Sequence, residues 1–241
     1  MITATDLQVR ASAQLLLEHA SFRIAPGDKV GLVGRNGAGK TTLTRILAGE
    51  AQPAGGTVTR TGPVGYLPQD PRTGDPDVLG RDRILSARGL DTVVAGLRVA
   101  EQQIAANEQD QHELGMRRYA QLENEFVARG GYAAESQAAT IAASLGLPDR
   151  VLGQPLRTLS GGQRRRVELS RILFSEAETI LLDEPTNHLD ADSIGWLRDF
   201  LRGYAGGIVV ISHDVALLDR TVTRVFHLDA TRAALDIYNV G

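Results

Sequence analysis

The sequence contains no cysteine. The chain therefore has no disulfide bond, no thiolate metal site and no cysteine nucleophile. It also lacks any run of about 18 apolar residues, and no charged-then-apolar leader stands at its N-terminus. From these absences we expect a protein that has no integral membrane segment, is not exported and stays in the cytoplasm.

An excess of positive charge is missing as well, because the formal net charge is −3 at pH 7. Affinity for phosphate backbones comes from clustered lysine and arginine, so any contact with nucleic acid would be local. Only Lys29 and Lys40 are lysines, and arginine carries the remaining positive charge. At 241 residues, with 42% hydrophobic and 23% charged residues, the chain can form one large globular domain or a domain with a small subdomain.

A glycine-rich segment follows the apolar run 30–33 and precedes an expected helix at 40–48. It consists of Gly34, Arg35, Asn36, Gly37, Ala38, Gly39, Lys40, Thr41 and Thr42. Small residues allow successive backbone N–H groups to point at phosphate oxygens, and a helix N-terminus adds partial positive charge. Lys40 would reach the β- and γ-phosphates, and the Thr41 hydroxyl would bind Mg²⁺. The alternative is an ordinary glycine-rich turn, but the whole pattern arises at roughly one position in 30,000.

Strands and helices alternate over most of the chain. We expect strands at 2–9, 15–22, 30–33, 57–59, 64–67, 179–182 and 208–211, helices at 40–48, 161–176 and 192–204, and a short helix with two closing strands after residue 214. The first of these strands is expected at a sheet edge. The alternation predicts an α/β fold with a mostly parallel sheet, in which ligands bind at the carboxyl ends of the strands.

The middle of the chain has a different pattern. Proline and glycine punctuate residues 71–76, which we interpret as a boundary. Helices are expected at 90–104, 116–128 and 133–145. Residues 81–130 contain seven basic and eight acidic side chains, a balance typical of a solvated helical surface, with a partner-binding face as the alternative. We therefore expect a core of about 1–71 and 159–241 and a helical subdomain of about 72–158, within one domain spanning 1–241.

Two carboxylates follow the apolar strand expected at 179–182. Asp183 can hold Mg²⁺ through its waters beside the Thr41 hydroxyl, in a site built from oxygen atoms. Glu184 points in another direction and can polarise the water that attacks the γ-phosphate, as general base or water positioner. The alternative is that two acidic residues merely end a strand, but the preceding phosphate loop favours the catalytic interpretation.

The order of these motifs resembles that of the ATP-binding cassette (ABC) ATPases. The motifs are the phosphate loop, Gln69, the run Leu159, Ser160, Gly161, Gly162 and Gln163, the pair Asp183 and Glu184, and His213. The resemblance covers essentially the whole chain, and its most specific part is the Leu-Ser-Gly-Gly-Gln run. It implies the ABC nucleotide-binding fold with an antiparallel β edge, catalytic roles for Lys40, Gln69, Glu184 and His213, and Mg²⁺ ligands at Thr41, Gln69 and Asp183. Taken alone, Gln69 and His213 would more often be ordinary surface or core residues.

The Ser160–Gln163 run suits a second anion site, because it presents a hydroxyl and unhindered amides at a helix N-terminus. In the family, this site binds the ATP that is held by the phosphate loop of a partner cassette. Each motif occurs once in this chain. The resemblance therefore implies a second cassette, in the parent chain or as a homodimer, that completes each hydrolytic site.

One stretch resembles the F subfamily in particular. It reads Glu184, Pro185, Thr186, Asn187, His188, Leu189 and Asp190, and the ending at 225–238 is similar as well. F-subfamily members are soluble twin-cassette proteins that act on ribosomes, with a linker that reaches the peptidyl-tRNA. The resemblance implies an ATP-driven clamp with ribosome and tRNA as partners, in translation regulation or protection from antibiotics. Because the chain stops where that linker would begin, we expect the N-terminal cassette of a longer protein.

Two alternative functions remain. One is the ATPase subunit of a membrane transporter, which Thr186, Asn187 and His188 argue against. The other is a module that uses ATP only for assembly and does not hydrolyse it, which the intact catalytic set argues against.

Two features depart from the family pattern. Cassettes usually stack adenine on an aromatic residue near the end of the first strand, but residues 9–17 contain none. Either Arg10 or apolar contacts meet the adenine, or nucleotide selectivity is loose. The region between Gln69 and Leu159 is also short for the long helical arm that some F-subfamily members insert. We therefore expect no contact with ribosomal protein or RNA through such an arm.

Overall fold

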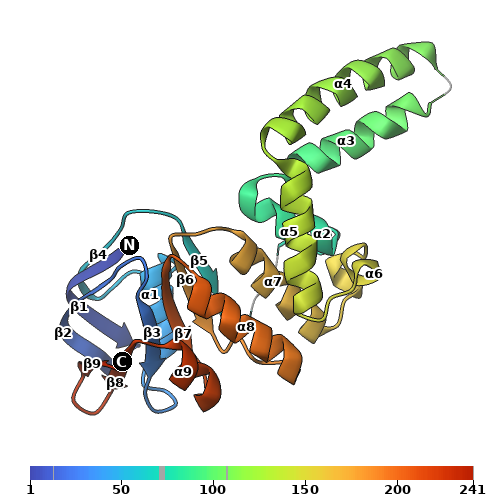
Figure 1. Ribbon diagram of the computed structural model, residues 1–241. Coiled ribbons are helices and arrows are strands. Elements are labelled where there is room, and N and C mark those ends of the chain that lie inside the picture. Colours follow the sequence, from blue (N-terminus) through green and yellow to red (C-terminus); the bar gives the residue numbers. More distant parts are fainter. Residues whose placement is uncertain (13, 71–73, 107, 241) are drawn as a thin grey trace. The chain divides into compact units, whose positions relative to one another are not determined.

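The computed structural model describes residues 1–12, 14–70, 74–106 and 108–240. The chain divides into two compact units (Figure 1). The first comprises Met1–Arg72 and Glu176–Gly241, and the second comprises Thr73–Ser175. The boundary expected at 71–76 lies partly outside the described residues.

The first unit contains a six-stranded sheet with the order β5-β6-β7-β3-β8-β9. Its strands are β3 (Lys29–Val33), β5 (Val64–Leu67), β6 (Thr179–Asp183), β7 (Gly207–Ile211), β8 (Arg224–Asp229) and β9 (Ala234–Asn239). All neighbours pair in parallel except β8 and β9, which are antiparallel. Every residue of β6 and β7 is buried, as expected for short apolar strands in the middle of a parallel sheet. The predicted α/β fold with a mostly parallel core sheet is confirmed.

A smaller antiparallel sheet in the same unit has the order β2-β1-β4. Its strands are β1 (Ile2–Ala11), β2 (Gln14–Ile24) and β4 (Gly55–Arg60). The prediction that the first strand lies at a sheet edge is wrong, because β1 pairs with both β2 and β4. Alternating burial shows only that one face of a strand is covered and does not reveal how many strands flank it.

The core of the first unit joins both sheets. Phe22 on β2 packs edge-on against Phe226 on β8, with ring centroids 5.1 Å apart. Helix α1 (Lys40–Ala48) contributes Leu43 and Leu47 to the same buried cluster. Helices α8 (Ala191–Gly203) and α9 (Val215–Thr221) complete the unit. The core thereby fixes the start of α1 relative to the ends of the parallel strands.

The second unit is almost entirely helical. It contains α2 (Gly80–Leu85), the 3₁₀ turn η1 (Ser86–Arg88), α3 (Asp91–Ile104), α4 (Gln109–Ala128), α5 (Gly131–Ser144), α6 (Asp149–Leu152), η2 (Leu156–Thr158) and α7 (Gly161–Phe174). We expected a helical subdomain ending near residue 158, whereas this compact unit extends to Ser175, because α7 packs against α2 and α5.

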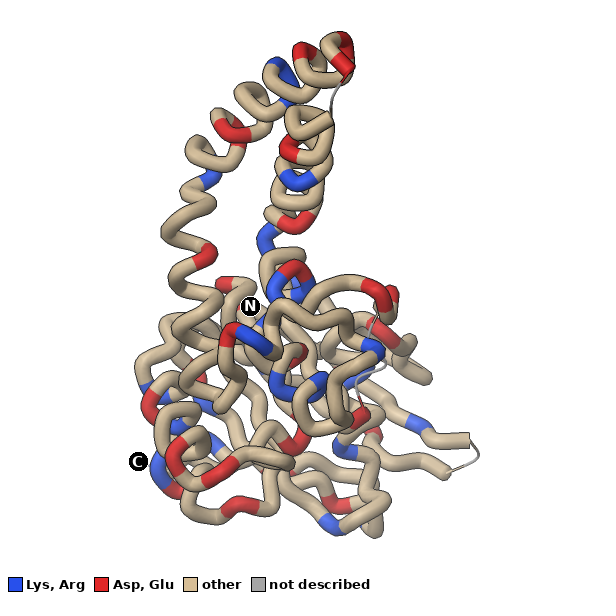
Figure 2. The backbone as a smooth tube through the Cα atoms, turned by 90° about the vertical axis from the view of Figure 1, so that its right-hand side faces the viewer, with Lys and Arg blue, Asp and Glu red and all other residues tan. Residues whose placement is uncertain are grey.

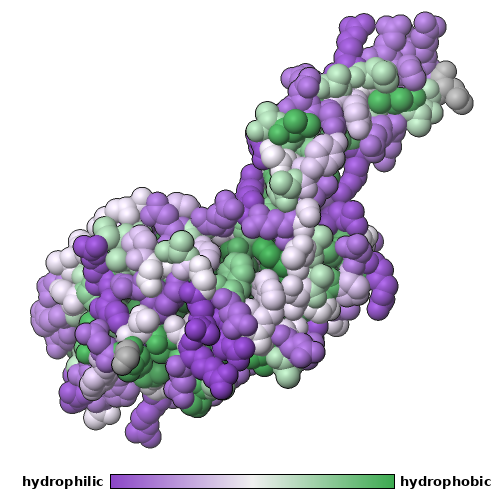
Figure 3. Space-filling view, viewed as in Figure 1, coloured by the Kyte–Doolittle hydropathy of each residue, from purple (hydrophilic) through white to green (hydrophobic). Residues whose placement is uncertain are grey.

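Helices α3 and α4 form an antiparallel hairpin that extends from the rest of the second unit (Figure 1). Helix α4 has 20 residues and is therefore about 30 Å long. The region between Gln69 and Leu159 thus contains a two-helix hairpin, and the expectation that it is too short for the long arm of some F-subfamily members stays a prediction. Apolar and hydrophilic side chains are interspersed on the surface of the hairpin (Figure 3). No helix in the described part of the chain has both the length and the apolar character needed to cross a bilayer.

Candidate functional site

The glycine-rich loop leads directly into α1. Gly39 has φ 100° and ψ 14°, a left-handed conformation that places the loop against the first turn of the helix. The Lys40 Nζ donates hydrogen bonds to the carbonyl oxygens of Gly34, at 2.8 Å, and Arg35, at 3.1 Å. No side chain caps the start of α1, so the first backbone N–H groups of the helix remain available to an anion.

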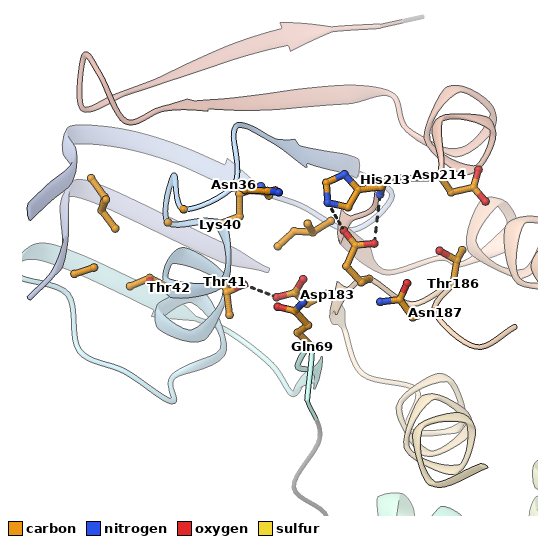
Figure 4. A pocket seen from close by; sticks show the side chains of 16 residues that line it. Asn36, Lys40, Thr41, Thr42, Gln69, Asp183, Thr186, Asn187, His213 and Asp214 are labelled. Carbon is orange, nitrogen blue, oxygen red and sulfur yellow. Dashed lines mark hydrogen bonds and ion pairs between the residues drawn. The ribbon is translucent and has the colours of Figure 1, made fainter. Parts of the chain in front are cut away.

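Asp183 is the last residue of β6 and lies next to the start of α1 (Figure 4). Its Oδ2 accepts a hydrogen bond of 2.7 Å from the Thr41 hydroxyl, and only 2% of the residue is exposed. The two oxygen groups therefore lie side by side, and their role as Mg²⁺ ligands stays a prediction. Gln69, which follows β5, has its side chain beside Asp183 in the same view.

Glu184 diverges from Asp183. Its backbone has φ 50°, which is unusual for a residue other than glycine, and its N–H donates to the carbonyl oxygen of Ile211 on β7, at 2.8 Å. The residue is 6% exposed. The adjacent carboxylates thus face different groups, Asp183 toward α1 and Glu184 toward the residues after β7.

His213 contacts both oxygens of the Glu184 carboxylate (Figure 4). Its ring Nε2 lies 3.4 Å from Oε1, and its backbone N–H donates to Oε2 at 3.3 Å. The His213 side chain is 71% exposed, whereas that of Glu184 is 9% exposed. The imidazole is therefore placed between a buried carboxylate and the open side of the cavity.

These groups surround one cavity of about 510 Å³. The lining residues foreseen from the sequence are Asn36, Gly37, Gly39, Lys40, Thr41, Thr42, Gln69, Asp183, Glu184 and His213. Of the other predicted loop residues, Ala38 is buried, and Arg35 and Ala38 line a different cavity beside the turn between β8 and β9. Gly34 contributes the carbonyl oxygen that accepts a hydrogen bond from Lys40.

Further lining residues were not assigned to the site from the sequence. They are Ala11, Leu16, Thr186, Asn187, Ile211 and Asp214. Leu16 is 1% exposed and packs directly on the α-carbon side of Gly39. Arg10 is not among the described residues that line the cavity. We expected either Arg10 or apolar residues to contact the adenine ring, and it is the apolar residues Ala11 and Leu16 that line this cavity.

The residues predicted to bind a partner's nucleotide belong to the second unit. Ser160 caps α7, where its Oγ accepts a hydrogen bond of 3.2 Å from the Gln163 N–H. The Gln163 Oε1 in turn accepts a hydrogen bond of 2.9 Å from the Ser160 N–H, which completes a capping box. Gly161 has open space around its α-carbon. The role of these residues, including Gly162, stays a prediction.

The donor set beside α1 fits a magnesium ion. Thr41 and Asp183 offer a hydroxyl and a carboxylate 2.7 Å apart, and Gln69 offers an amide oxygen beside them. Magnesium prefers oxygen ligands, one or two of them carboxylates. Within the described residues there is no cluster of three or more His, Asp or Glu side chains that could hold a metal by themselves.

A parallel sheet, a glycine-rich loop that enters a helix with a lysine, and an aspartate at the end of a nearby strand define a P-loop nucleotide-binding domain. The sequence model of the family described as "ABC transporter" matches residues 17–187. The chain belongs to this ATP-binding cassette family, and it is an ABC ATPase domain.

Relatives narrow the resemblance. The tylosin resistance ATP-binding protein TlrC of Streptomyces fradiae is 39% identical over 227 residues, which cover 91% of this chain and 41% of TlrC. The energy-dependent translational throttle protein EttA of Haemophilus influenzae is 37% identical over 222 residues, which cover 89% of this chain and 38% of EttA. The predicted resemblance to the F subfamily is confirmed by these relatives. The chain spans about two fifths of the length of each.

Solved structures support the fold. The ATP-binding cassette MJ0796, in a dimeric post-hydrolysis state bound to ADP and Pi, matches 100% of this chain and 99% of its own with a TM-score of 0.69. The two sequences are 17% identical, so this likeness concerns the fold alone.

Proposed function

We propose that this chain is one Mg²⁺-dependent ATPase cassette of an F-subfamily protein that acts as an ATP-driven clamp on the ribosome. The observation that carries the proposal is the placement of two carboxylates at one cavity beside the phosphate loop. Asp183 meets the Thr41 hydroxyl, and Glu184 meets His213.

The end of the cavity beside the glycine-rich loop carries the positive charge of Lys40 and the partial positive charge at the start of α1. Lys40 and the uncapped amides at the start of α1 would bind the β- and γ-phosphates. Lys40 already holds its ammonium group over the loop through the carbonyls of Gly34 and Arg35, so little reorientation is needed. Mg²⁺, held by Thr41, Gln69 and Asp183, would neutralise charge that develops on the phosphates.

Glu184 would activate or position the attacking water. The carboxylate is buried and its backbone is fixed by the hydrogen bond to Ile211, so its direction is constrained. His213 contacts the same carboxylate and has an exposed ring, which suits a group that meets the γ-phosphate at the open side of the cavity. Hydrolysis requires the His213 ring to leave room for water beside Glu184.

A second cassette would complete the site. Ser160, Gly161 and Gly162 offer a hydroxyl and a helix N-terminus to an anion, and the dimeric state of the similar cassette bound to ADP and Pi supports pairing. We propose that ATP binding closes two cassettes on each other and that hydrolysis reopens them. The second cassette would lie in the parent chain, with this chain at its N-terminal side, or be a second copy.

The relatives supply the partner class. EttA is named a translational throttle protein and TlrC a tylosin resistance protein. Both names suit action on the ribosome, and tRNA would be met through the rest of the parent protein. Translation regulation and protection from an antibiotic are both compatible with the clamp. Because ribosomes are cytoplasmic, the proposal retains the location expected from the sequence.

The decisive experiment measures ATP hydrolysis by the parent protein with and without purified ribosomes. We expect ribosomes to stimulate hydrolysis and Glu184→Gln to lower kcat by about 100-fold or more, while ATP binding persists. The matched control is Glu178→Gln, because the Glu178 side chain is half exposed and pairs with the N-terminus, away from the cavity. Unchanged turnover in Glu184→Gln would refute the role of this carboxylate. Robust hydrolysis by this chain alone, indifferent to ribosomes, would refute the clamp.

A further inference from the structure

Within the second unit, the short segment 80–89, formed by α2, η1 and the residue that follows, makes side-chain contacts both with the hairpin α3–α4 and with α7. Acidic and basic residues occur together along the hairpin and at its base (Figure 2). Four arginines make the contacts, two toward α7 and two toward the hairpin. The segment therefore lies at a junction between the hairpin and the helix that begins at the Ser160–Gln163 run.

Toward α7, the contacts involve a buried carboxylate. The Arg83 guanidinium donates to both oxygens of Glu168, at 2.5 and 3.2 Å, and the Glu168 side chain is only 4% exposed. Arg171 donates to the same carboxylate at 2.9 Å. Arg88 of η1 donates to the carbonyl oxygen of Phe174 at 2.7 Å, and its guanidinium lies 3.8 Å from the centroid of the Phe174 ring. Both α2 and η1 are thus bound to α7.

Toward the hairpin, the neighbouring residue of α2 makes the equivalent contact. The Arg98 guanidinium of α3 donates to both oxygens of Asp82, at 2.5 and 2.8 Å, and Asp82 is 8% exposed. Arg129, the residue after α4, donates to the carbonyl oxygen of Gly89, the residue after η1, at 3.1 Å. Consecutive residues of one short helix, Asp82 and Arg83, therefore connect to the hairpin and to α7 respectively.

We propose that Asp82 and Arg83 are positioning residues that couple the hairpin to α7, so that displacement of the hairpin moves Ser160, Gly161 and Gly162. Two-point arginine–carboxylate pairs restrain both distance and orientation. Helix α7 is continuous from Gly161 to Phe174, so a shift at Glu168 is carried to its first turn, two turns away. The proposal rests on the proposed function of Ser160–Gly162 in binding a partner's nucleotide.

The low exposure of the two carboxylates, 12% for the Asp82 side chain and 4% for that of Glu168, supports a positional role. Buried ion pairs are seldom more stabilising than apolar residues of the same volume, but they fix geometry. The hairpin also contains a pair of another kind, because Arg117 and Glu113 lie on the same helix and their side chains are 80% and 56% exposed. That pair joins no two elements. It provides a matched control for removing one arginine from the hairpin.

The test uses two nitroxide labels, which the absence of cysteine makes straightforward. Gln111→Cys labels the exposed far part of the hairpin, and Gly161→Cys labels the start of α7, where a side chain meets open space. Pulsed electron spin resonance gives the distribution of distances between them. We expect Arg98→Met to widen this distribution at least twofold relative to the unmutated pair. Arg117→Met should leave it unchanged, and the exchange Asp82→Arg with Arg98→Asp should narrow it again.

The coupling would be overturned if the distance distribution of Arg98→Met were as narrow as that of the labelled protein without this substitution. It would also be overturned if Arg117→Met broadened the distribution as much as Arg98→Met does. Should Arg98→Met fail to fold by circular dichroism, Arg98→Lys decides, since an ammonium cannot bridge both Asp82 oxygens as a guanidinium does. Its expected width is intermediate, and an unaltered width overturns the proposal.

A second readout addresses the nucleotide site. In the parent protein, Arg98→Met should lower kcat/KM for ATP at least threefold, and the exchange variant should restore it. The distance measurement needs no nucleotide, so loss of the coupling and failure of the proposed ATPase function give different results. Restored width without restored kcat/KM would overturn the link to Ser160–Gly162.

Discussion

Gly39→Ala offers a quantitative test of how the phosphate loop is held. A β-carbon added at Gly39 would lie 2.5 Å from the Leu16 Cδ1 and 3.2 Å from its Cβ. Leu16 is 1% exposed and has no solvent to move into. The left-handed backbone costs alanine about 1–2 kcal/mol, and overpacking adds about 1–3 kcal/mol. We therefore expect Gly39→Ala to destabilise the first unit by about 2–5 kcal/mol.

Gly37→Ala separates the backbone cost of a positive φ from the cost of overpacking against Leu16. Gly37 also has a positive φ, of 79°, but no atom lies within 4 Å of its added β-carbon. Only the backbone cost of about 1–2 kcal/mol should appear there. Leu16→Ala provides the complement, because it removes the side chain that the new methyl group meets. In the Leu16→Ala background, Gly39→Ala should no longer cause overpacking. The two substitutions together should therefore destabilise the protein by about 1–3 kcal/mol less than the sum of their separate effects in a double-mutant cycle.

Urea unfolding followed by tryptophan fluorescence is a suitable assay. Trp196 is the one tryptophan of the chain and lies on α8, in the same compact unit as Gly39. The signal therefore reports the unit that contains the loop. Equal destabilisation by Gly39→Ala and Gly37→Ala would refute the steric argument, and so would strict additivity of Gly39→Ala with Leu16→Ala.

Three other predictions concern separate parts of the structure. Glu168→Gln leaves the guanidinium groups of Arg83 and Arg171 without their buried carboxylate and should lower the free energy of unfolding by about 3 kcal/mol. A denaturant titration followed by circular dichroism measures this, and an unchanged midpoint would contradict the prediction. The hydrogen bond from Arg232 lowers the pKa of Asp229 to about 2 from 3.8, so the stabilisation present above pH 3.8 should be lost as pH falls toward 2. Asp229→Asn should remove that pH dependence of the unfolding midpoint, and an identical profile would count against it. Thr41→Val removes the hydroxyl that donates to Asp183, so it should lower the free energy of unfolding by about 1–2 kcal/mol. It should also reduce the rise in melting temperature that ATP causes in the presence of Mg²⁺, and an unreduced rise would contradict the prediction.

Local signals in the sequence predicted the elements around the site well. Helix α1 has the predicted bounds because Gly39 and Gly49, both left-handed, flank it. Strand β5 also matches, and β6 is one residue longer than predicted because Asp183 still pairs with β7. The end of β3, the glycine-rich loop and the start of α1 follow one another directly in the sequence. The bounds of the elements around the glycine-rich loop could therefore be predicted without knowledge of the tertiary fold.

Features that depend on distant segments were less accessible. The number of neighbours of β1 is set by β4, about 50 residues away, and nothing in residues 2–9 indicates it. Helix α4 starts at Gln109, seven residues before the predicted start, because its first five residues, 109–113, are all polar and give no apolar period to detect. Leu16 was part of an expected strand, but its packing on Gly39 depends on how β2 and α1 meet in the core. The misses at β1 and Leu16 share one cause, since each is decided by packing between elements, whereas the start of α4 was missed because the local pattern is polar.

Glu184 shows where structure adds what the sequence motif cannot. Its positive φ of 50° costs an acidic residue about 1–2 kcal/mol, and the neighbouring Asp183 belongs to a regular strand. A strained residue persists only where its surroundings hold it, here the Ile211 carbonyl and the two contacts with His213. The positive φ turns the Glu184 carboxylate away from Thr41 and Asp183 and toward His213. The division of the pair into a metal ligand and a water activator, which we propose above, would depend on this bend of the backbone between them.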